Sequence, residues 1–267
     1  MRIAIKFAYD GKKFHGVARQ LGLRTVEGEI INVLAKKRVI ASPKKNRFQI
    51  ASRTDKNVSA IGNVFAFNTK FLSIKKIEDL LFFLNSHIDD CIFYGYKIVE
   101  HDFNPRKPLM RWYRYILDNR YNIDKIKKFA NLFIGMHDFK NFSASDFATK
   151  RKIEKIKVSS TKNFIFIDFY AESFLYKMVR KIISGIIKGV EGKFCLIELK
   201  DALNCKKTID FGLASAEDLI LMDIIYPFDF ILSDRVYNEM RKKVGKKIIE
   251  IKKEEYFYGG VWKILKR

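Results

Sequence analysis

The order of strand-like and helix-like segments most constrains the fold of this chain. Residues 2–9 alternate between apolar and polar side chains, a pattern typical of a half-buried strand. A helix after Thr25, a pair of strands over 49–67, a helix after Ser73 and a strand over 91–99 complete the order β-α-β-β-α-β. Beyond Pro105 and Pro108 the pattern repeats. Its predicted elements are strands over 112–117, 153–159, 164–171 and 219–226, helices over 124–136 and 175–190, and an added helical stretch over 196–205.

The charge balance points to a polyanionic partner. Lys and Arg number 52 against 30 Asp and Glu, which gives a formal net charge of +22. A general bias toward Lys and Ile accounts for part of this excess. A surplus this large favours binding to nucleic acid, the commonest polyanion in a cell.

Together these features predict an α+β fold with two ferredoxin-like halves, residues 1–104 and 105–232. We expect a mostly antiparallel sheet that carries helices on one face and an RNA-binding cleft on the other. Residues 233–267 form a basic extension, predicted as a short helix followed by two strands around Gly259 and Gly260. The extension is interpreted either as a solvated charged face or as an auxiliary RNA contact, and the sequence leaves both open.

Several function classes are disfavoured by the sparse metal-ligating residues. The cysteines are odd in number and far apart, and no pair of histidines has a metal-binding spacing: Cys91, Cys195, Cys205, His15, His87, His101 and His137. We therefore expect no metal and no disulfide. Early charges exclude a signal peptide and no apolar run suits a membrane span, so we expect a cytoplasmic protein with no membrane partner. A metal-dependent nuclease would need clustered carboxylates, which are missing around Asp55.

Asp55 is the first candidate for chemistry. It lies in a polar turn between two strands, with Arg53 two residues before it and Lys56 directly after it. Nearby positive charge favours the ionised form of a carboxylate, which makes a nucleophile on a loop plausible. The alternative is an ordinary turn or N-cap aspartate, which residue type alone favours.

Two further segments carry candidate site residues. The run Arg111-Trp112-Tyr113-Arg114-Tyr115 places Arg111 and Tyr113 on the same face of a strand, although a strand tyrosine is more often a core residue. Farther along, Arg180 lies at the edge of the apolar face of the 175–190 helix, and Lys177 lies on its flank. An arginine there either extends to solvent or directs its guanidinium into a cleft.

The amino-acid sequences of these segments also resemble the motifs of a known family. The run Arg53-Thr54-Asp55-Lys56 with Val58, Ser59, Ala60 and Gly62 resembles the catalytic loop of the tRNA pseudouridine synthase A family. Further similar motifs follow in the family's order: Arg111-x-Tyr113-Arg114-Tyr115, Gly135-x-His137-Asp138-Phe139, Phe174-x-x-x-Met178-Val179-Arg180-x-Ile182 and Ala214-x-Ala216-Glu217-x-Leu219. The resemblance extends from the N-terminus to Pro227 and not beyond it.

The resemblance implies an isomerase that turns uridine into pseudouridine in tRNA without cofactor or metal. It implies Asp55 as nucleophile, Arg180 as its partner and Tyr113 beside the base, and we expect Arg53, Lys56, Arg111 and Lys177 to bind substrate. It further implies a homodimer and target uridines at about positions 38–40, on the 3′ side of the anticodon stem and loop, which must leave their stack to react.

The chain departs from the family pattern at a few positions. Val17 and Ala18 stand where the family commonly has Trp-Gln, Asn57 replaces a frequent glycine, and Ser59 stands where many members have histidine. These changes concern substrate contacts rather than the reaction. The alternative functions are a non-catalytic RNA-binding protein, and a pseudouridine synthase that acts on other RNA sites.

Overall fold

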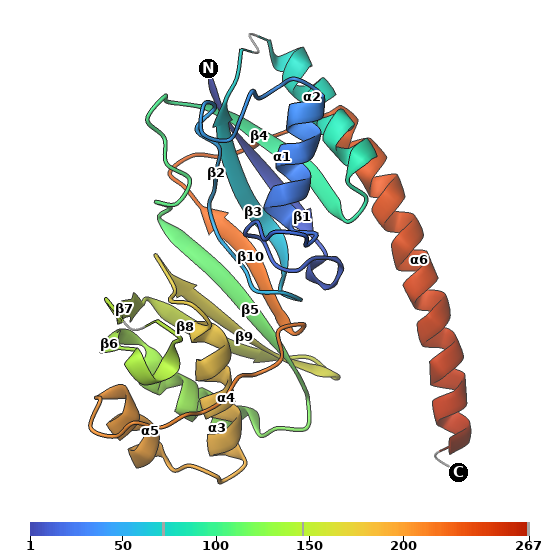
Figure 1. The fold of residues 1–267 in the computed structure, drawn as a ribbon. Helices are drawn as coiled ribbons and strands as arrows, with labels where there is room; N and C mark the ends of the chain where they lie inside the picture. Colours follow the sequence, from blue (N-terminus) through green and yellow to red (C-terminus); the bar gives the residue numbers. More distant parts are fainter. Residues whose placement is uncertain (71–72, 146, 266–267) are drawn as a thin grey trace.

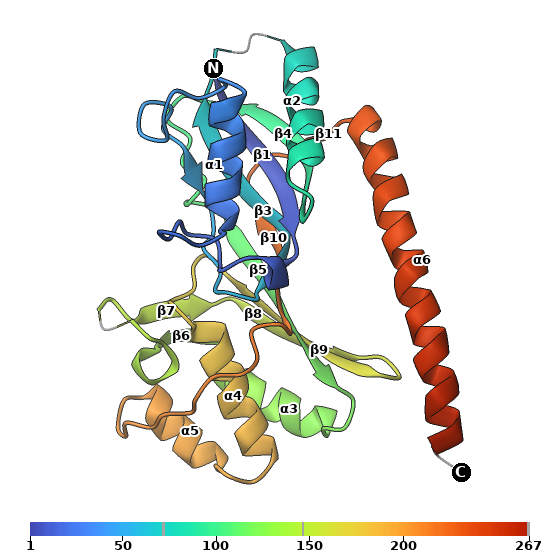
Figure 2. The same cartoon turned by 45° about the vertical axis from the view of Figure 1, so that its right-hand side comes forward.

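A single large β-sheet organises the protein. The computed structural model describes residues 1–70, 73–145 and 147–265, and in that part of the chain the sheet has nine strands. Eight of them follow the order β11-β4-β1-β3-β10-β5-β9-β8, and β2 pairs with β3. Neighbours are antiparallel except β3 and β10, which are parallel. Figures 1 and 2 show helices packed along one side of this sheet. The expected α+β class with a mainly antiparallel sheet is confirmed.

The first part of the chain supplies the elements in the order expected from the sequence. They are β1 (Arg2–Tyr9), a 3₁₀ turn (Gly11–Lys13), α1 (Val26–Lys36), β2 (Gln49–Ile50), β3 (Ser59–Asn68), α2 (Ile74–His87) and β4 (Cys91–Val99). The two helices begin where the sequence indicated. The side chains of Thr25 and Ser73 accept hydrogen bonds from the backbone N–H groups of Gly28 and Lys76, which would otherwise lack partners.

The second part of the chain departs from the expected order at its first helix and its second strand, and it adds two short strands. Its elements are β5 (Met110–Asp118), α3 (Ile123–Ala130), 3₁₀ turns (Asn131–Phe133 and Lys140–Phe142), β6 (Gly135–Asp138), β7 (Lys150–Ile153), β8 (Lys155–Ser160), β9 (Phe164–Ala171), α4 (Met178–Val190), α5 (Leu196–Leu203), β10 (Leu219–Ile225) and β11 (Ile231–Leu232). The helix expected to reach residue 136 ends at Ala130, and Gly135 adopts a positive φ of 105°. The strand expected over 153–159 is divided, because β7 pairs with β6 in a separate two-stranded sheet.

Strand β10 connects the early and late parts of the chain. It is parallel to β3, with Leu221 opposite Ala60, and antiparallel to β5, with Leu221 opposite Tyr113. The start of β3, directly after the Asp55 loop, is therefore one strand away from Tyr113. The sheet topology thus brings together two motifs that are far apart in sequence.

The two faces of the sheet differ in their cover. On β5 the side chains of Arg111, Tyr113, Tyr115 and Leu117 are buried, and those of the alternate residues are only partly so. Helix α4 contributes a fully buried set to the covered face: Ile182, Ile183 and Ile186. Tyr113 and Arg111 therefore lie on the helix-bearing side of the sheet.

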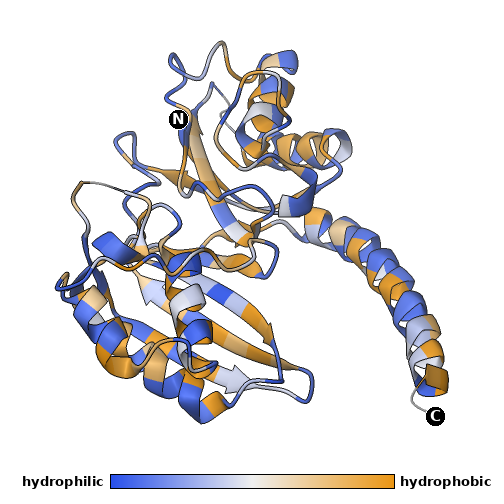
Figure 3. Cartoon of the chain, turned by 60° about the horizontal axis from the view of Figure 1, so that its bottom comes forward, coloured by the Kyte–Doolittle hydropathy of each residue, from blue (hydrophilic) through white to orange (hydrophobic). Residues whose placement is uncertain are grey.

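The expectation for the C-terminal extension was wrong in its secondary structure. Residues 234–265 form one helix, α6 (Asp234–Leu265), which leaves the body beside β4 and extends past it, as Figure 1 shows. Gly259 and Gly260 lie inside this helix instead of in a turn. Each glycine costs about 1 kcal/mol in a helix. The nearest residues are not strong helix formers, namely Tyr256, Phe257, Tyr258, Val261 and Trp262. The local sequence therefore does not indicate a continuous helix. Figure 3 shows apolar and polar residues alternating along α6. No helix among the described residues has the length and apolar character that a membrane span needs.

Candidate active site

The loop from Ala51 to Val58 is rigidly held between β2 and β3. Ala51 donates its N–H to the carbonyl of Val64 at 2.8 Å, and the Asn63 amide donates to the carbonyl of Ser52 at 2.9 Å. The hydroxyl groups of Thr54 and Tyr9 lie 2.8 Å apart in the core. A cross-linked loop of this kind presents the partly buried side chain of Asp55 in a fixed position.

Two glycines allow a neighbouring segment to pack against the back of this loop. Gly16 has a φ of +92°, and a Cβ placed there would lie 3.2 Å from the carbonyl oxygen of Thr54. A Cβ at Gly11 would collide with the backbone carbonyl of Val58. Asn57 itself adopts a φ of 70°, a left-handed conformation that asparagine tolerates better than most residues. The departure at position 57 is therefore compatible with the turn.

Asp55 and Arg180 form an ion pair across the two parts of the chain. Arg180 Nη1 donates to Asp55 Oδ2 at 2.8 Å, and the two side chains retain only 16% and 20% exposure. Arg180 Nε donates to the carbonyl of Ala214 at 2.9 Å, which fixes the guanidinium from its other side. Since Arg180 lies in the first turn of α4, the helix directs this cation toward the loop. The arginine thus extends into a cleft and not to solvent.

Tyr113 lies beneath the ion pair on β5. Its hydroxyl group is 2.8 Å from Ser52 Oγ, and its ring makes an edge contact with Phe174 at a centroid distance of 5.2 Å. Burial raises the pKa of Tyr113, an effect larger than the opposing one of the hydrogen bond to Ser52. The phenol therefore stays protonated at neutral pH and can act as a hydrogen-bond donor.

Two hollows meet at the Asp55–Arg180 pair. One has a volume of about 430 Å³ and reaches down to Tyr113, Arg111 and Phe174, and the other has a volume of about 660 Å³ and extends along His15, Gly16 and Gln20. Both are lined by the same group of residues, namely Arg53, Thr54, Asp55, Tyr176, Lys177 and Arg180. A volume of 430 Å³ is within the range of small-molecule sites.

The location of these hollows corrects one expectation. The cleft was expected on the sheet face opposite the helices, yet the hollow around Asp55 includes Arg111 and Tyr113, which face the helices, and the first turn of α4. The reason is that the Asp55 loop and the N-terminus of α4 meet over the sheet, between the two groups of helices. The sequence pattern does not show where the Asp55 loop and the N-terminus of α4 meet.

The other predicted site residues lie around the hollows in different environments. Arg53 and Lys56 are exposed, and Lys177 is partly buried and lies over the Tyr176 ring at 4.9 Å. Lys56 lines only the larger hollow. Arg111 is only 8% exposed and donates to backbone carbonyls, including that of Ala51 at 3.1 Å. Burial lowers the pKa of Arg111. Its bond to Ala51 ties β5 to the Asp55 loop.

Sequence reasoning missed the residues that support the site. Ser52 positions the Tyr113 hydroxyl, and Asn63 closes the base of the loop through bonds to the Ser52 backbone. Ser52 directly precedes the catalytic-loop run, which was the one available signal. Nothing in the pattern of residues pairs it with a tyrosine 61 positions away. Within the described residues, no group of three or more His, Cys, Asp or Glu side chains is arranged to hold a metal ion.

Comparison with known proteins places this chain in a family. Residues 129–227, which include Arg180, match the family model described as tRNA pseudouridine synthase. Among curated proteins, the chain is 40% identical to the tRNA pseudouridine synthase A of Thermococcus sibiricus, over 85% of each chain. It is 37% identical to the same-named proteins of Methanothermobacter thermautotrophicus and Pyrococcus abyssi. The first match covers 84% of this chain and 81% of the relative, and the second covers 91% and 92%. This chain therefore belongs to the tRNA pseudouridine synthase A family, a family of isomerases.

Proposed function

We propose that this protein converts uridine to pseudouridine in tRNA, at uridines of the anticodon stem and loop. The observation that carries the proposal is the Asp55–Arg180 ion pair, with an N–O distance of 2.8 Å, at the junction of two hollows. A reacting base and its ribose fit the smaller hollow, and the flanking RNA follows the larger one. The net charge of +22 suits a polyanionic substrate.

In the proposed reaction, Asp55 attacks the target nucleotide after its base has left the RNA stack. A bond forms between an Asp55 carboxylate oxygen and ribose C1′ as the bond between C1′ and base N1 breaks. The uracil then rotates, and C5 displaces the carboxylate as the new bond between C1′ and C5 forms. A proton leaves C5 and a proton is taken up at N1, so the atoms of substrate and product balance. Leaving the stack costs a few kcal/mol, which contacts inside the hollow must offset.

The neighbours of Asp55 have separate roles in this proposal. Arg180 keeps the carboxylate ionised and oriented through the 2.8 Å contact. Tyr113 packs beside the uracil and takes part in proton transfer, which its protonated state permits. Since Asp55 comes from residues 1–104 and both partners from 105–232, the two proposed halves would each contribute part of the site.

Four basic residues are proposed to bind the RNA. Arg53 stabilises the nucleotide that has left the stack, because it is exposed at the rim of both hollows. Lys56 and Lys177 contact phosphates along the larger hollow. The guanidinium of Arg111 is bonded to backbone carbonyls, so Arg111 supports the floor of the smaller hollow. The edge of the same guanidinium contacts the substrate. The proposed enzyme needs no cofactor or metal and is a cytoplasmic homodimer. Residues 233–267 lie outside the proposed active site.

The test compares Asp55→Asn with a matched aspartate. Asp55→Asn should reduce pseudouridine formation by roughly 10³-fold or more while tRNA affinity stays within about three-fold of the wild type. Asp210 is the control, because it also pairs with a cation of α4, Lys181 at 3.4 Å, but is 80% exposed. Asp210→Asn should leave product formation unchanged. Wild-type protein that binds tRNA at low salt but forms no pseudouridine would identify a non-catalytic RNA-binding protein instead.

A second measurement tests the position of the target. Unmodified tRNA is incubated with the protein, and pseudouridines are mapped along its sequence. Product confined to the 3′ side of the anticodon stem and loop supports the proposal. Product elsewhere would show a synthase with another target.

A further inference from the structure

One arginine of the smaller hollow has no part in the reaction proposed above. Asp55 is the single acid among the described residues that line this hollow. The cations that line it are Arg53, Arg106, Arg111, Lys177 and Arg180. Arg106 lines this hollow but not the larger one. A cation confined to the smaller hollow acts on the nucleotide that enters it, and not on RNA that follows the larger hollow.

The other four cations are already accounted for. Arg180 pairs with Asp55 at 2.8 Å. Arg111 donates its guanidinium hydrogens to backbone carbonyls. Arg53 and Lys177 line both hollows, so RNA along the larger hollow can use them. The smaller hollow therefore contains one further cation whose charge nothing in the site offsets.

The guanidinium of Arg106 is held along one edge only. Its Nε donates to the carbonyl of Ile50 at 3.3 Å, directly before the Asp55 loop. The side chain is exposed, and within the described part of the chain its two terminal nitrogens, Nη1 and Nη2, form no hydrogen bond or ion pair. Paired N–H groups of this kind match the geometry of a phosphate.

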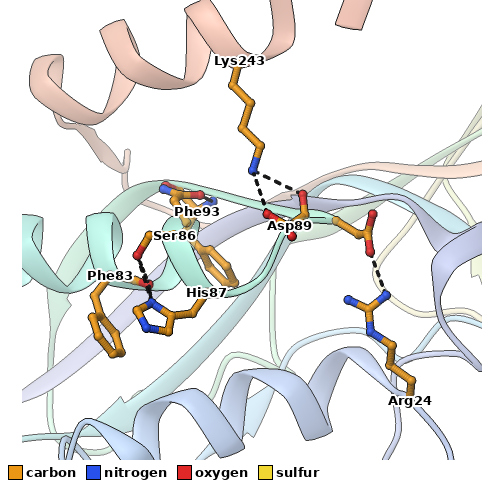
Figure 4. A network of polar contacts seen from close by, with 9 residues as sticks. Arg24, Phe83, Ser86, His87, Asp89, Phe93 and Lys243 are labelled. Atoms are coloured by element: carbon orange, nitrogen blue, oxygen red, sulfur yellow. Dashed lines mark hydrogen bonds and ion pairs between the residues drawn. The ribbon is translucent and has the colours of Figure 1, made fainter.

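Other cations of the chain show what a paired side chain looks like. Figure 4 shows Lys243 pointing from α6 to Asp89, at 3.8 Å from its carboxylate. In the same view Arg24 points to the turn before β4, where it lies 2.7 Å from the carboxylate of Asp90. Arg106 has no such partner among the described residues, so its terminal nitrogens are available to an external anion.

The backbone of Arg106 is fixed relative to the Asp55 loop. Its N–H donates to Asn104 Oδ1 at 3.0 Å. Arg111 Nη2 donates to the carbonyl of Arg106 and to that of Ala51, at 3.1 Å in each case. Arg106 and the Asp55 loop are therefore tied to the same guanidinium, which keeps their spacing constant when a ligand enters.

The reacting nucleotide brings negative charge into the hollow. Asp55 approaches ribose C1′ as a carboxylate, and the phosphates bonded to the same ribose are anions close to it. Like charges repel at short distance, most strongly where the surroundings have a low dielectric constant. Since Arg180 is already paired with Asp55, the phosphate needs a cation of its own.

From these observations we propose that Arg106 binds a phosphate of the reacting nucleotide through its terminal nitrogens and so holds the ribose against Asp55. The inference rests on the proposed function and adds a substrate-binding residue to it. The contact forms only after the nucleotide has entered the hollow. Arg106 therefore affects the rate of the reaction more than the affinity for tRNA.

The test measures single-turnover pseudouridine formation by the full-length protein at saturating excess over tRNA. Arg106→Met should slow the reaction by about 10- to 100-fold, with tRNA affinity within about three-fold of the wild type. Arg106→Lys keeps the charge but loses the paired N–H groups, so its loss should be smaller, about 3- to 10-fold.

Arg47→Met is the matched control. Arg47 is also exposed and also donates to a backbone carbonyl, that of His101 at 3.0 Å, but it lines neither hollow. Its replacement removes the same charge from the chain and should leave the reaction rate unchanged.

Uncharged linkages in the RNA identify the phosphate. The tRNA carries one methylphosphonate, on either the 5′ or the 3′ side of the target uridine. At the contacted position this replacement should slow the wild type and Arg47→Met by about 10- to 100-fold. It should slow Arg106→Met by less than about three-fold, because the contact is already lost. The position that shows this coupling is the phosphate that Arg106 binds.

Three results would overturn the inference. Arg106→Met could react as fast as Arg47→Met. The effects of Arg106→Met and of the methylphosphonate could multiply at both positions, which would mean that they act independently. A loss of tRNA affinity as large as the loss of rate would place Arg106 on flanking RNA. In all three cases the wild type still forms pseudouridine, whereas a wild type that forms none contradicts the proposed function itself.

Discussion

Replacing Arg180 with methionine tests how the ion pair supports the reaction. Methionine keeps an unbranched apolar stem but removes the cation, its 2.8 Å contact with Asp55 and its 2.9 Å hydrogen bond to the Ala214 carbonyl. Asp55 would keep its place in the cross-linked loop but lose the group that orients it. We therefore expect a folded protein with slower chemistry.

The size of the effect follows from the geometry. Two unit charges 2.8 Å apart attract by about 6 kcal/mol at an effective dielectric constant of 20. Desolvation of both side chains, which retain 16% and 20% exposure, offsets more than half of this attraction. The net contribution of the pair is therefore about 2–3 kcal/mol. If the same energy is lost in the transition state, turnover falls by about 30- to 150-fold.

A matched ion pair on the open face of the sheet provides the control. Arg114 donates to Asp168 from Nε at 2.8 Å and from Nη2 at 2.9 Å, and Asp168 is 5% exposed. Arg114 is 27% exposed, so Arg114→Met removes an ion pair of comparable burial, but on the side of β5 away from Tyr113. We expect it to lower stability by about 2 kcal/mol or more and to leave turnover unchanged.

The assay measures single-turnover release of tritium from C5 of uridine in labelled tRNA, with protein in excess. The C5 hydrogen leaves whenever C5 bonds to the ribose, so the signal reports the reaction itself. Turnover of Arg180→Met within three-fold of the wild type would refute the role given to Arg180. Equal losses in both variants would mean that only general stability had changed.

The remaining predictions concern proton transfer, loop geometry, alkaline stability and salt. Tyr113→Phe should slow product formation by about 10- to 100-fold with little change in tRNA affinity, measured with the tritium assay and by filter binding. Gly16→Ala should lower stability by about 2 kcal/mol and slow turnover, since it strains the backbone and presses on the Thr54 carbonyl; Gly22→Ala, with a φ of +72° and open space around it, should lower stability less and leave turnover intact. Burial raises the pKa of both Tyr9 and Tyr113, so their contribution to stability is complete below the unfolded-state pKa of about 10 and is lost as pH rises toward the higher pKa values of the folded state; the phenolate absorbance that the wild type has and Tyr113→Phe lacks should appear together with unfolding, and its appearance in folded protein at pH 10 would contradict this. If 6–10 phosphates are contacted, tRNA affinity should fall by about 10³- to 10⁵-fold between 50 and 200 mM salt, and a salt-independent affinity would refute an electrostatic interface.

Local patterns were sufficient for most of the secondary structure. Alternation identified β1 and β5, and side-chain caps at Thr25 and Ser73 marked the starts of α1 and α2. These signals work because both depend on residues close in sequence. The glycine pair in α6 misled the same reasoning, since a turn and a helix both accommodate glycine and the surrounding residues decide between them.

The sequence by itself determined the alternating strands, the capped helices, the positive charge and the motifs that contain Asp55, Tyr113 and Arg180. Only the tertiary structure decided that Arg180 lies 2.8 Å from Asp55, that Ser52 holds the Tyr113 hydroxyl, and that the hollow opens on the helix-bearing side of the sheet. The physical reason is that these contacts join residues 61 to 125 positions apart. Their distances follow from where β10 enters the sheet and how α4 packs on it, and no local pattern of residues encodes either.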